Sequence, residues 1–275
     1  VAGSAYWDKG GVADAGAATW CNGHKGLAGV VSSTNSLVGS RADDRVGSRI
    51  AELSNGHYVV SSPFWDNGAA ANAGAATWGN GAKGIAGPVT TANSLVGSQT
   101  GDMVSSGTVA ALTNGNYVVS SPSWNDGSCI AAGAVTWCNG SVKTTGKVTN
   151  INSLVGSTRH DRVGYGTRAL SNGHYVVSSP FWDNGPVVDA GAATWGSGIT
   201  GVRGPVGAAN SLVGGRHYDN VGNLSLRVFD HGNYVVPSSR WRISDSPYAD
   251  VGALTIGNPE TGTVGLVTQN NSVFG

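Results

Sequence analysis

Tyr58-Val-Val-Ser-Ser-Pro-Phe-Trp-Asp-Asn-Gly68 decides the fold, because close copies of this segment occur five times in the 275-residue chain. Each copy is followed by a version of Gly74-Ala-Ala-Thr-Trp-Gly-Asn-Gly81 and then of Asn93-Ser-Leu-Val-Gly-Ser98. The residues equivalent to Val59 are Val1, Val118, Val176 and Val235, which gives steps of 58 or 59 residues. Such a regular period indicates one structural unit repeated five times.

The second repeat predicts four short antiparallel strands and almost no helix. An Asn-Gly pair at 55–56 favours a tight hairpin, because both residues accept a positive φ. Pro63 ends the strand that follows, because proline has no amide hydrogen to donate to a sheet. Alternating or β-branched residues mark the strands, and no period of 3.6 is present. The expected strands are Ile50–Leu53, Tyr58–Ser62, Ala75–Trp78 and Ser94–Gly97.

Four short strands per repeat, repeated at a constant spacing, are typical of a β-propeller. We therefore predict an all-β fold: a five-bladed β-propeller of four-stranded antiparallel blades in a single domain. The first blade would lack its inner strand, because Val1 aligns with Val59 inside the second strand. A β-solenoid is the competing all-β fold, although its rungs are normally shorter. The five repeats are expected at residues 1–48, 49–107, 108–165, 166–224 and 225–275.

Charge and cysteine content narrow the classes of partner. Sixteen Lys and Arg residues balance sixteen Asp and Glu residues, so no basic field exists to hold nucleic acid. No apolar run reaches the length of a membrane span, so we expect no membrane insertion. Three cysteines do not make a disulfide framework. Cys21 and Cys138 occupy a position that is glycine in other repeats, and a Cys129–Cys138 bridge is conceivable only if the strand starts after Cys129.

All nine tryptophans fall at two positions of the repeat. The first set lies at the end of the third strand, where we expect the rings to pack between blades. Ile256 replaces this tryptophan in the fifth repeat, which fits a packing role. This set consists of Trp20, Trp78, Trp137 and Trp195.

The second tryptophan set follows the second strand and consists of Trp7, Trp65, Trp124, Trp182 and Trp241. The next residue in the first four repeats is Asp8, Asp66, Asn125 or Asp183. An indole beside a carboxylate or amide is the combination that sugar sites use, with the ring stacked on the sugar and the oxygens accepting its hydroxyl hydrogens. A tryptophan that caps the end of the blade, beside an Asx turn, is an equally open alternative.

A second acidic residue lies in each linker between repeats. These linkers should emerge on the same face as the loops that carry the second tryptophan set, so we include their acids in the candidate sugar-binding site. The alternative is that each carboxylate caps main-chain N–H groups in a tight turn. The linker acids are Asp44, Asp102, Asp161 and Asp219.

Catalytic and cofactor motifs are missing from the sequence. No Gly-rich phosphate loop and no Gly-x-Ser-x-Gly elbow occur, and the histidines lack zinc-site spacing. Asp66 and Asn67 offer oxygens to calcium, but the twelve-residue calcium loop is not present. We therefore expect no enzyme activity and no cofactor, with calcium as a weak candidate.

The repeated Tyr-Val-Val-Ser-Ser-Pro-x-Trp-Asp-Asn-Gly, Gly-Ala-x-Thr-Trp-Gly-Asn-Gly and Asn-Ser-Leu-Val-Gly-Ser motifs resemble repeats of large bacterial haemagglutinin-like exoproteins over nearly the whole chain. A ring of five units is more distantly similar to five-bladed β-propeller lectins. These resemblances imply a propeller fold in an extracellular, secreted protein. No individual residue carries over from the lectins, because their motifs are not present here.

We therefore expect a secreted, multivalent carbohydrate-binding protein, a lectin whose partners are glycans or glycoconjugates. About four sites are expected rather than five, because Trp241 is followed by Arg242 instead of an acid or amide. The alternative is a non-catalytic structural or adhesion module that binds protein partners. The incomplete first blade leaves an uncovered strand edge, through which the chain could form a homo-oligomer.

Overall fold

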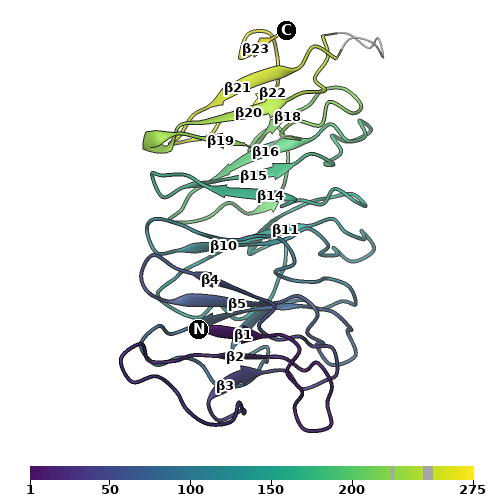
Figure 1. Cartoon of the computed structure of the whole chain (residues 1–275). Helices are drawn as coiled ribbons and strands as arrows, with labels where there is room; N and C mark the ends of the chain where they lie inside the picture. Colours follow the sequence, from purple (N-terminus) through teal and green to yellow (C-terminus); the bar gives the residue numbers. More distant parts are fainter. Residues whose placement is uncertain (224–225, 244–249) are drawn as a thin grey trace. The chain divides into compact units, whose positions relative to one another are not determined.

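The computed structural model describes residues 1–223, 226–243 and 250–275, and the predicted repeat boundary between 224 and 225 lies outside them. The all-β prediction is confirmed: five small sheets match the five repeats (Figure 1). The only helical turn in the described residues is a 3-10 turn at Asp230–Gly232. No described helix is long and apolar enough to cross a membrane.

The chain divides into two compact units. The first comprises Val1–Ala111, Gly115–Val119 and Cys138–Val148, and the second comprises Leu112–Asn114, Ser120–Trp137 and Thr149–Gly275. The boundary falls within the third repeat. A single domain of five repeats stays a prediction.

Two complete sheets lie in the first unit. One has the strand order β1-β2-β3-β7 and the other β12-β8-β6-β5-β4. The strands of the first are β1 (Ala2–Ser4), β2 (Ala17–Thr19), β3 (Ser36–Val38) and β7 (Gly87–Pro88). Those of the second are β4 (Arg49–Glu52), β5 (Tyr58–Ser62), β6 (Ala75–Gly79), β8 (Ser94–Val96) and β12 (Gly146–Lys147). The first unit also contains β9 (Val109–Ala111), antiparallel to the start of β10 (Tyr117–Ser121).

The second unit repeats this strand order. Its complete sheets are ordered β14-β15-β16-β18-β22 and β19-β20-β21-β23. Their strands are β14 (Gly166–Ala169), β15 (Tyr175–Ser179), β16 (Ala192–Gly196), β18 (Leu212–Val213), β22 (Gly265–Leu266), β19 (Arg227–Val228), β20 (Tyr234–Ser238), β21 (Ala253–Gly257) and β23 (Ser272–Phe274). In the third repeat, β11 (Ala134–Cys138) pairs with β13 (Ser153–Val155), which pairs with β17 (Gly204–Pro205).

The predicted strands of the second repeat are observed within one residue at each end, as β4, β5, β6 and β8. They pair in the predicted order and are antiparallel, because hairpins connect them. In the first sheet, β1 is the equivalent of β5, and no described strand takes the place of β4. The sheet of the first repeat therefore begins at the second strand of the pattern, and a first blade that lacks its inner strand stays a prediction.

Consecutive repeats are joined by main-chain pairs that the sequence did not predict. Strand β3 of the first repeat pairs in parallel with β7 of the second, with Leu37 opposite Gly87 and Val38 opposite Pro88. The same parallel pair recurs as β8–β12, β13–β17 and β18–β22. Two-residue strands have too short a pattern to recognise in sequence, so this connection between repeats was missed.

A glycine before the third strand allows the chain to pass close to a linker. Gly74 has φ of +76°, and an added Cβ would lie 2.3 Å from the backbone nitrogen of Val104. The two residues form a parallel bridge, which recurs as Gly16–Val46, Gly133–Val163 and Gly191–Val221. Only glycine fits a left-handed backbone in this contact. The first residue of the Gly-Ala-Ala-Thr-Trp motif is therefore explained by backbone geometry.

Candidate functional site

The tryptophans after the second strand are mostly buried. Trp65, Trp124, Trp182 and Trp241 are 5%, 4%, 4% and 3% exposed, and only Trp7 is half-buried. A ring that is covered on both faces has no face left for a sugar. The stacking role expected for Trp65, Trp124 and Trp182 therefore does not fit this geometry, and the capping alternative does.

The residue after each of these tryptophans closes its own loop. Asp66 Oδ1 accepts the backbone N–H of Asn72 at 2.7 Å, and Asp183 Oδ1 accepts that of Asp189 at 2.8 Å. Asp8 and Asn125 accept the equivalent N–H groups of Asp14 and Ala131 at 2.9 Å. These bonds stabilise the equivalent turn in each of the first four repeats. One side-chain oxygen of each of these four predicted sugar-binding residues therefore accepts a hydrogen bond from the protein itself.

The linker acids are fully buried and cap main-chain N–H groups. Asp44 Oδ2 accepts the N–H groups of Ser40 and Arg41 at 2.7 and 2.8 Å. Its Oδ1 accepts the N–H of Asp66 in the next repeat at 2.9 Å. Asp161 repeats this pattern toward Ser157, Thr158 and Asp183. Asp102 and Asp219 also cap the two N–H groups that follow the fourth strand.

The predicted meeting of linker acid and loop acid is therefore present, but its role is internal. Asp44 and Asp66 are neighbours because the first carboxylate holds the backbone of the second. Burial raises the pKa of Asp44, and the nearby Asp66 charge raises it further, while the backbone hydrogen bonds lower it. Asp44 is 0% exposed and offers no atom to a ligand.

The tryptophans at the end of the third strand connect consecutive repeats. Trp20 Nε1 donates to the Gly81 carbonyl oxygen of the second repeat at 2.9 Å, and Trp78 Nε1 donates to Gly140 at 2.9 Å. Trp137 and Trp195 make the equivalent bonds to Gly198 and Pro259, both at 3.0 Å. These four indoles are half-buried. In addition to the packing expected for them, these indoles therefore each donate a hydrogen bond to the next repeat.

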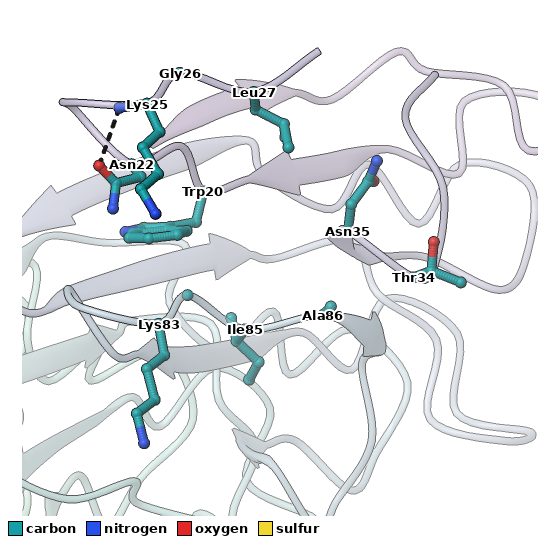
Figure 2. Close-up of a pocket in the computed structure, with 11 residues that line it drawn as sticks. Trp20, Asn22, Lys25, Gly26, Leu27, Thr34, Asn35, Lys83, Ile85 and Ala86 are labelled. Atoms are coloured by element: carbon teal, nitrogen blue, oxygen red, sulfur yellow. Dashed lines mark hydrogen bonds between the residues drawn. The ribbon is translucent and has the colours of Figure 1, made fainter. Parts of the chain in front are cut away.

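A groove beside Trp20 is the best candidate for a ligand site. It has a volume of about 420 Å³ and lies between the loop after β2 and the loop before β7. In Figure 2 the Trp20 ring and Lys25 lie at one end, and Asn35 and Thr34 lie at the other. Lys83 and Ile85 come from the second repeat on the opposite wall (Figure 2). We call this the Trp20 groove.

Hydrogen-bond donors of the Trp20 groove remain available. Asn22 Oδ1 accepts the N–H groups of His24 and Lys25, at 2.9 and 3.2 Å, which leaves its amide NH2 free within the described residues. Neither the Lys25 nor the Lys83 ammonium has a partner in the part of the chain that the structure describes. The equivalents of these two lysines in the later repeats are Val142, Thr200 and Thr261. Lysines therefore line both walls of the groove only in the first pair of repeats, and in Figure 2 the Lys25 ammonium lies beside the Trp20 ring while that of Lys83 points away from it.

Sequence reasoning missed two kinds of residue at the contact between repeats. The turn residue Asn55, read only as a hairpin former, donates its side-chain amide to the carbonyls of Gly115 and Gly140 at 3.2 and 3.0 Å. Asn172 makes the equivalent bond to Pro259 at 2.9 Å. The lysines of the Trp20 groove were missed because a single Lys in a polar loop has no distinctive signal. The identical Lys-Gly spacing at Lys25 and Lys83 was the only available clue.

Cysteine and acidic side chains add no further site. All three cysteines are free, so the Cys129–Cys138 bridge is not formed. Burial raises the pKa of the Cys138 thiol to about 12, which keeps the thiol protonated and unreactive. Among the residues that the structure describes, no three His, Cys, Asp or Glu side chains gather in a group that could hold a metal ion.

Comparison with known families identifies the repeat but not its activity. The family described as a repeat of unknown function (DUF5650) matches residues 1–48, 52–106, 111–165, 169–223 and 228–275. The chain belongs to this family. Its five tandem copies coincide with the five predicted repeats, but the match provides no link to haemagglutinin-like exoproteins or lectins. No curated protein matches the chain.

Proposed function

We propose that this DUF5650 protein is a non-catalytic structural or adhesion module that binds protein partners. One observation supports this most strongly: the repeated tryptophans and acids make internal bonds. The linker acids cap turns, and the third-strand indoles donate to the following repeat. A series of such contacts provides a spacer that can present surface loops to a partner. An extracellular location is part of this proposal.

Single-molecule stretching between the two chain ends tests the spacer role. A load-bearing array should give several force peaks, because each repeat holds its own sheet and a junction to its neighbour. Release of one repeat of about 58 residues should lengthen the chain by roughly 200 Å, at about 3.4 Å per residue. Smooth extension without force peaks would contradict a mechanical role.

Carbohydrate binding is a second candidate, and the Trp20 groove supports it. Its indole, the Lys25 ammonium and the free amide of Asn22 can stack on a sugar ring and donate to its oxygens. The unpaired Lys25 ammonium beside the Trp20 ring favours an acidic sugar, such as a uronic acid or a sulfated saccharide. We therefore propose a single acidic-glycan site, in place of the four equivalent sites expected from the loop tryptophans.

Intrinsic fluorescence and a glycan array together test this second candidate. An acidic oligosaccharide should change the emission of Trp20, while its neutral counterpart should not. Lys25→Gln should weaken binding about tenfold, since a charge-assisted hydrogen bond contributes on the order of 1.5 kcal/mol, and Lys83→Gln should weaken it less because its ammonium points away from Trp20. Lys143→Gln is the matched control, because Lys143 Nζ donates to the Ala92 carbonyl outside this groove. No response to any glycan would refute the site.

Closure of the five repeats into a propeller is a further proposal. It requires the fifth and first repeats to meet through a junction like the one between β3 and β7. Small-angle X-ray scattering tests it, because a closed ring has a smaller radius of gyration than an open row of the same five repeats. A radius of gyration well above that of a compact 275-residue domain would rule the ring out.

A further inference from the structure

The turn after the third strand connects the second repeat to the first through a single glycine. The Gly81 carbonyl oxygen accepts the Trp20 indole N–H of the preceding repeat at 2.9 Å. The N–H of the same glycine donates within its own repeat, to His57 Nδ1 at 3.0 Å. An added Cβ at Gly81 would collide with the Gly56 carbonyl oxygen, so the glycine is held closely against the hairpin. Movement of Gly81 away from His57 therefore also disturbs its bond to Trp20.

The same construction recurs along the chain, but the residue that accepts the glycine N–H changes. The first to fourth indole junctions are Trp20–Gly81, Trp78–Gly140, Trp137–Gly198 and Trp195–Pro259. In the third, the Gly198 N–H donates to His174 Nδ1 at 3.0 Å. In the second, the Gly140 N–H donates to Asn116 Oδ1 at 3.1 Å. Pro259 of the fourth has no N–H and needs no acceptor. Each of these junctions lies within one compact unit.

Histidine and asparagine differ as acceptors, because only histidine exchanges a proton near neutral pH. Nδ1 accepts an N–H only while the ring is neutral and carries its proton on Nε2. A protonated ring has an N–H at both positions, so His57 Nδ1 would then face the Gly81 N–H with a hydrogen of its own. The side-chain oxygen of Asn116 keeps its acceptor character throughout. An ordinary imidazole changes its charge between about pH 5 and 8.

The groups that face the two imidazoles are similar except for one acid. Both rings pack on the third-strand tryptophan of their own repeat, with centroids 4.7 and 4.8 Å apart. Attraction between a cation and an indole is weaker than the penalty of leaving an enclosed main-chain N–H without an acceptor. Glu260 Oε2 of the fifth repeat lies 3.9 Å from His174 Nε2. Ser141 stands at the equivalent position of the third repeat, and no Asp or Glu of the described residues pairs with His57. A proton should therefore disturb the turn at His57 more than at His174.

We propose that acid weakens the first and third indole junctions by protonating His57 and His174, and leaves the second junction closed. An open junction frees Nδ1 to take up a proton that the closed junction excludes. Opening therefore becomes easier as pH falls through the range of an ordinary imidazole, and the effect is absent above that range. Acid would then loosen the row of repeats at defined places. The proposal goes beyond the spacer function, since it adds a response to pH.

Hydrogen exchange at the indole N–H groups of the full chain, followed by nuclear magnetic resonance, tests the proposal. Protection relative to free indole at the same pH should fall about tenfold for Trp20 between about pH 8 and pH 5, as expected for the loss of roughly one hydrogen bond. Trp137 should lose protection to a smaller extent, whereas Trp78 and Trp195 should keep theirs. Chemical shifts alone do not suffice, because a charge on His57 shifts the signal of the adjacent Trp78 ring without opening its junction.

Two substitutions exchange the acceptors between repeats and serve as matched controls. His57→Asn gives the second repeat the acceptor that the third repeat uses, and it should remove the acid response of Trp20 alone. Asn116→His is the reverse change, and the protection of Trp78 should then fall in acid. Each variant is compared with itself at the two pH values, so that a constant change in packing cancels.

The local measurement is needed because a further histidine also accepts a main-chain N–H. His217 Nδ1 accepts that of Val188 at 3.0 Å within the fourth repeat, so it contributes to any pH dependence of global unfolding. Constant protection of Trp20 in acid would overturn the proposal, as would an equal loss at all four indoles. An acid response of Trp20 that persists in His57→Asn would overturn it as well, because another titrating group would then control the junction.

Discussion

Asp161 and Asp219 occupy equivalent linker positions, before the fourth and the fifth repeat, but differ in their bond to the loop that follows. Asp161 accepts the N–H of Asp183 at 3.0 Å in addition to the two N–H groups at its own turn. Asp219 caps its own turn in the same way, yet its Oδ1 has no hydrogen-bond partner and is buried. Arg242 stands in the fifth repeat where Asp183 stands in the fourth.

This difference separates two functions of one carboxylate. Both Asp161 and Asp219 cap the turn in their own linker, so this capping does not depend on the bond to the next loop. The bond to the next loop is present at Asp161 and missing at Asp219, and it accompanies an acid at the position after the tryptophan. The fifth repeat therefore keeps the local structure and loses a connection. It has also lost the indole of Trp195, which Ile256 replaces.

The largest expected effect is the loss of stability when the buried tryptophan that both repeats share is removed. Trp182→Ala and Trp241→Ala should each destabilise the protein by about 3–5 kcal/mol, because both rings are almost fully buried. Urea denaturation followed by circular dichroism measures this cost. The half-buried Trp7 is the matched comparison, and Trp7→Ala should cost less. A cost of less than about 1 kcal/mol for Trp182→Ala would mean that the ring is exposed in solution and would revive the stacking hypothesis.

The next largest effect is a difference in the stability cost of replacing Asp161 and Asp219. Asp161→Asn should cost about 1–3 kcal/mol, because both carboxylate oxygens face N–H donors and one must be replaced by an NH2 group. Asp219→Asn should cost almost nothing at neutral pH, because its NH2 group can occupy the position of the unpartnered Oδ1. The urea midpoints of the two variants give the comparison. Equal costs would show that the bond to the next loop contributes no stability.

The repeated architecture could be predicted because each strand carries a local pattern. The β-branched residues of β5, Pro63 and the Asn-Gly hairpin fix β4 and β5 within a residue of their observed ends. The parallel segments β7 and β12 could not be predicted, because each is two residues long and its partner lies about 50 residues away. Recognition of a repeat period says that units are similar but not how one unit is joined to the next.

The candidate site was predicted less well, for a reason visible at Trp65 and Asp66. A Trp-Asp pair in a loop has the same sequence whether its oxygens face a sugar or a main-chain N–H. In the structure, Asp66 Oδ1 accepts the backbone N–H of Asn72, and the Trp65 indole is buried. Trp20 was assigned only to packing, although its half-buried ring lies in a groove. Burial depends on neighbouring repeats, which the local pattern does not reveal.

A smaller effect tests the indole that the fifth repeat has lost. Trp195→Phe keeps an aromatic ring against Gly262 but removes the hydrogen bond to the Pro259 carbonyl. The expected cost is about 0.5–1.5 kcal/mol, the usual contribution of one hydrogen bond. Thermal unfolding monitored by calorimetry measures it. Ile256→Phe should have no such cost, since Ile256 is exposed and makes no equivalent bond, so a similar loss in both variants would contradict the role of the indole.

The smallest effect is the pH dependence that Asp219 contributes to stability. Burial raises the pKa of Asp219 above its ordinary value of 3.8, although its two backbone hydrogen bonds and the charges of Arg242 and Arg216 oppose the rise. In the pH range just above 3.8, the unfolded chain therefore loses this proton before the folded chain does. The free energy of unfolding then decreases as pH rises through this window, and the loss persists at neutral pH.

Asp219→Asn isolates this contribution, because asparagine does not titrate. The stability of the variant relative to the unmodified chain should increase as pH rises from about 3.8 through the folded pKa of Asp219, and should then stay constant. Urea denaturation at a series of pH values measures the difference between the two proteins. A difference that instead shrinks over this window would mean that the two backbone bonds and the neighbouring arginines outweigh burial. The folded protein would then stabilise the ionised form of Asp219, although its Oδ1 has no hydrogen-bond partner.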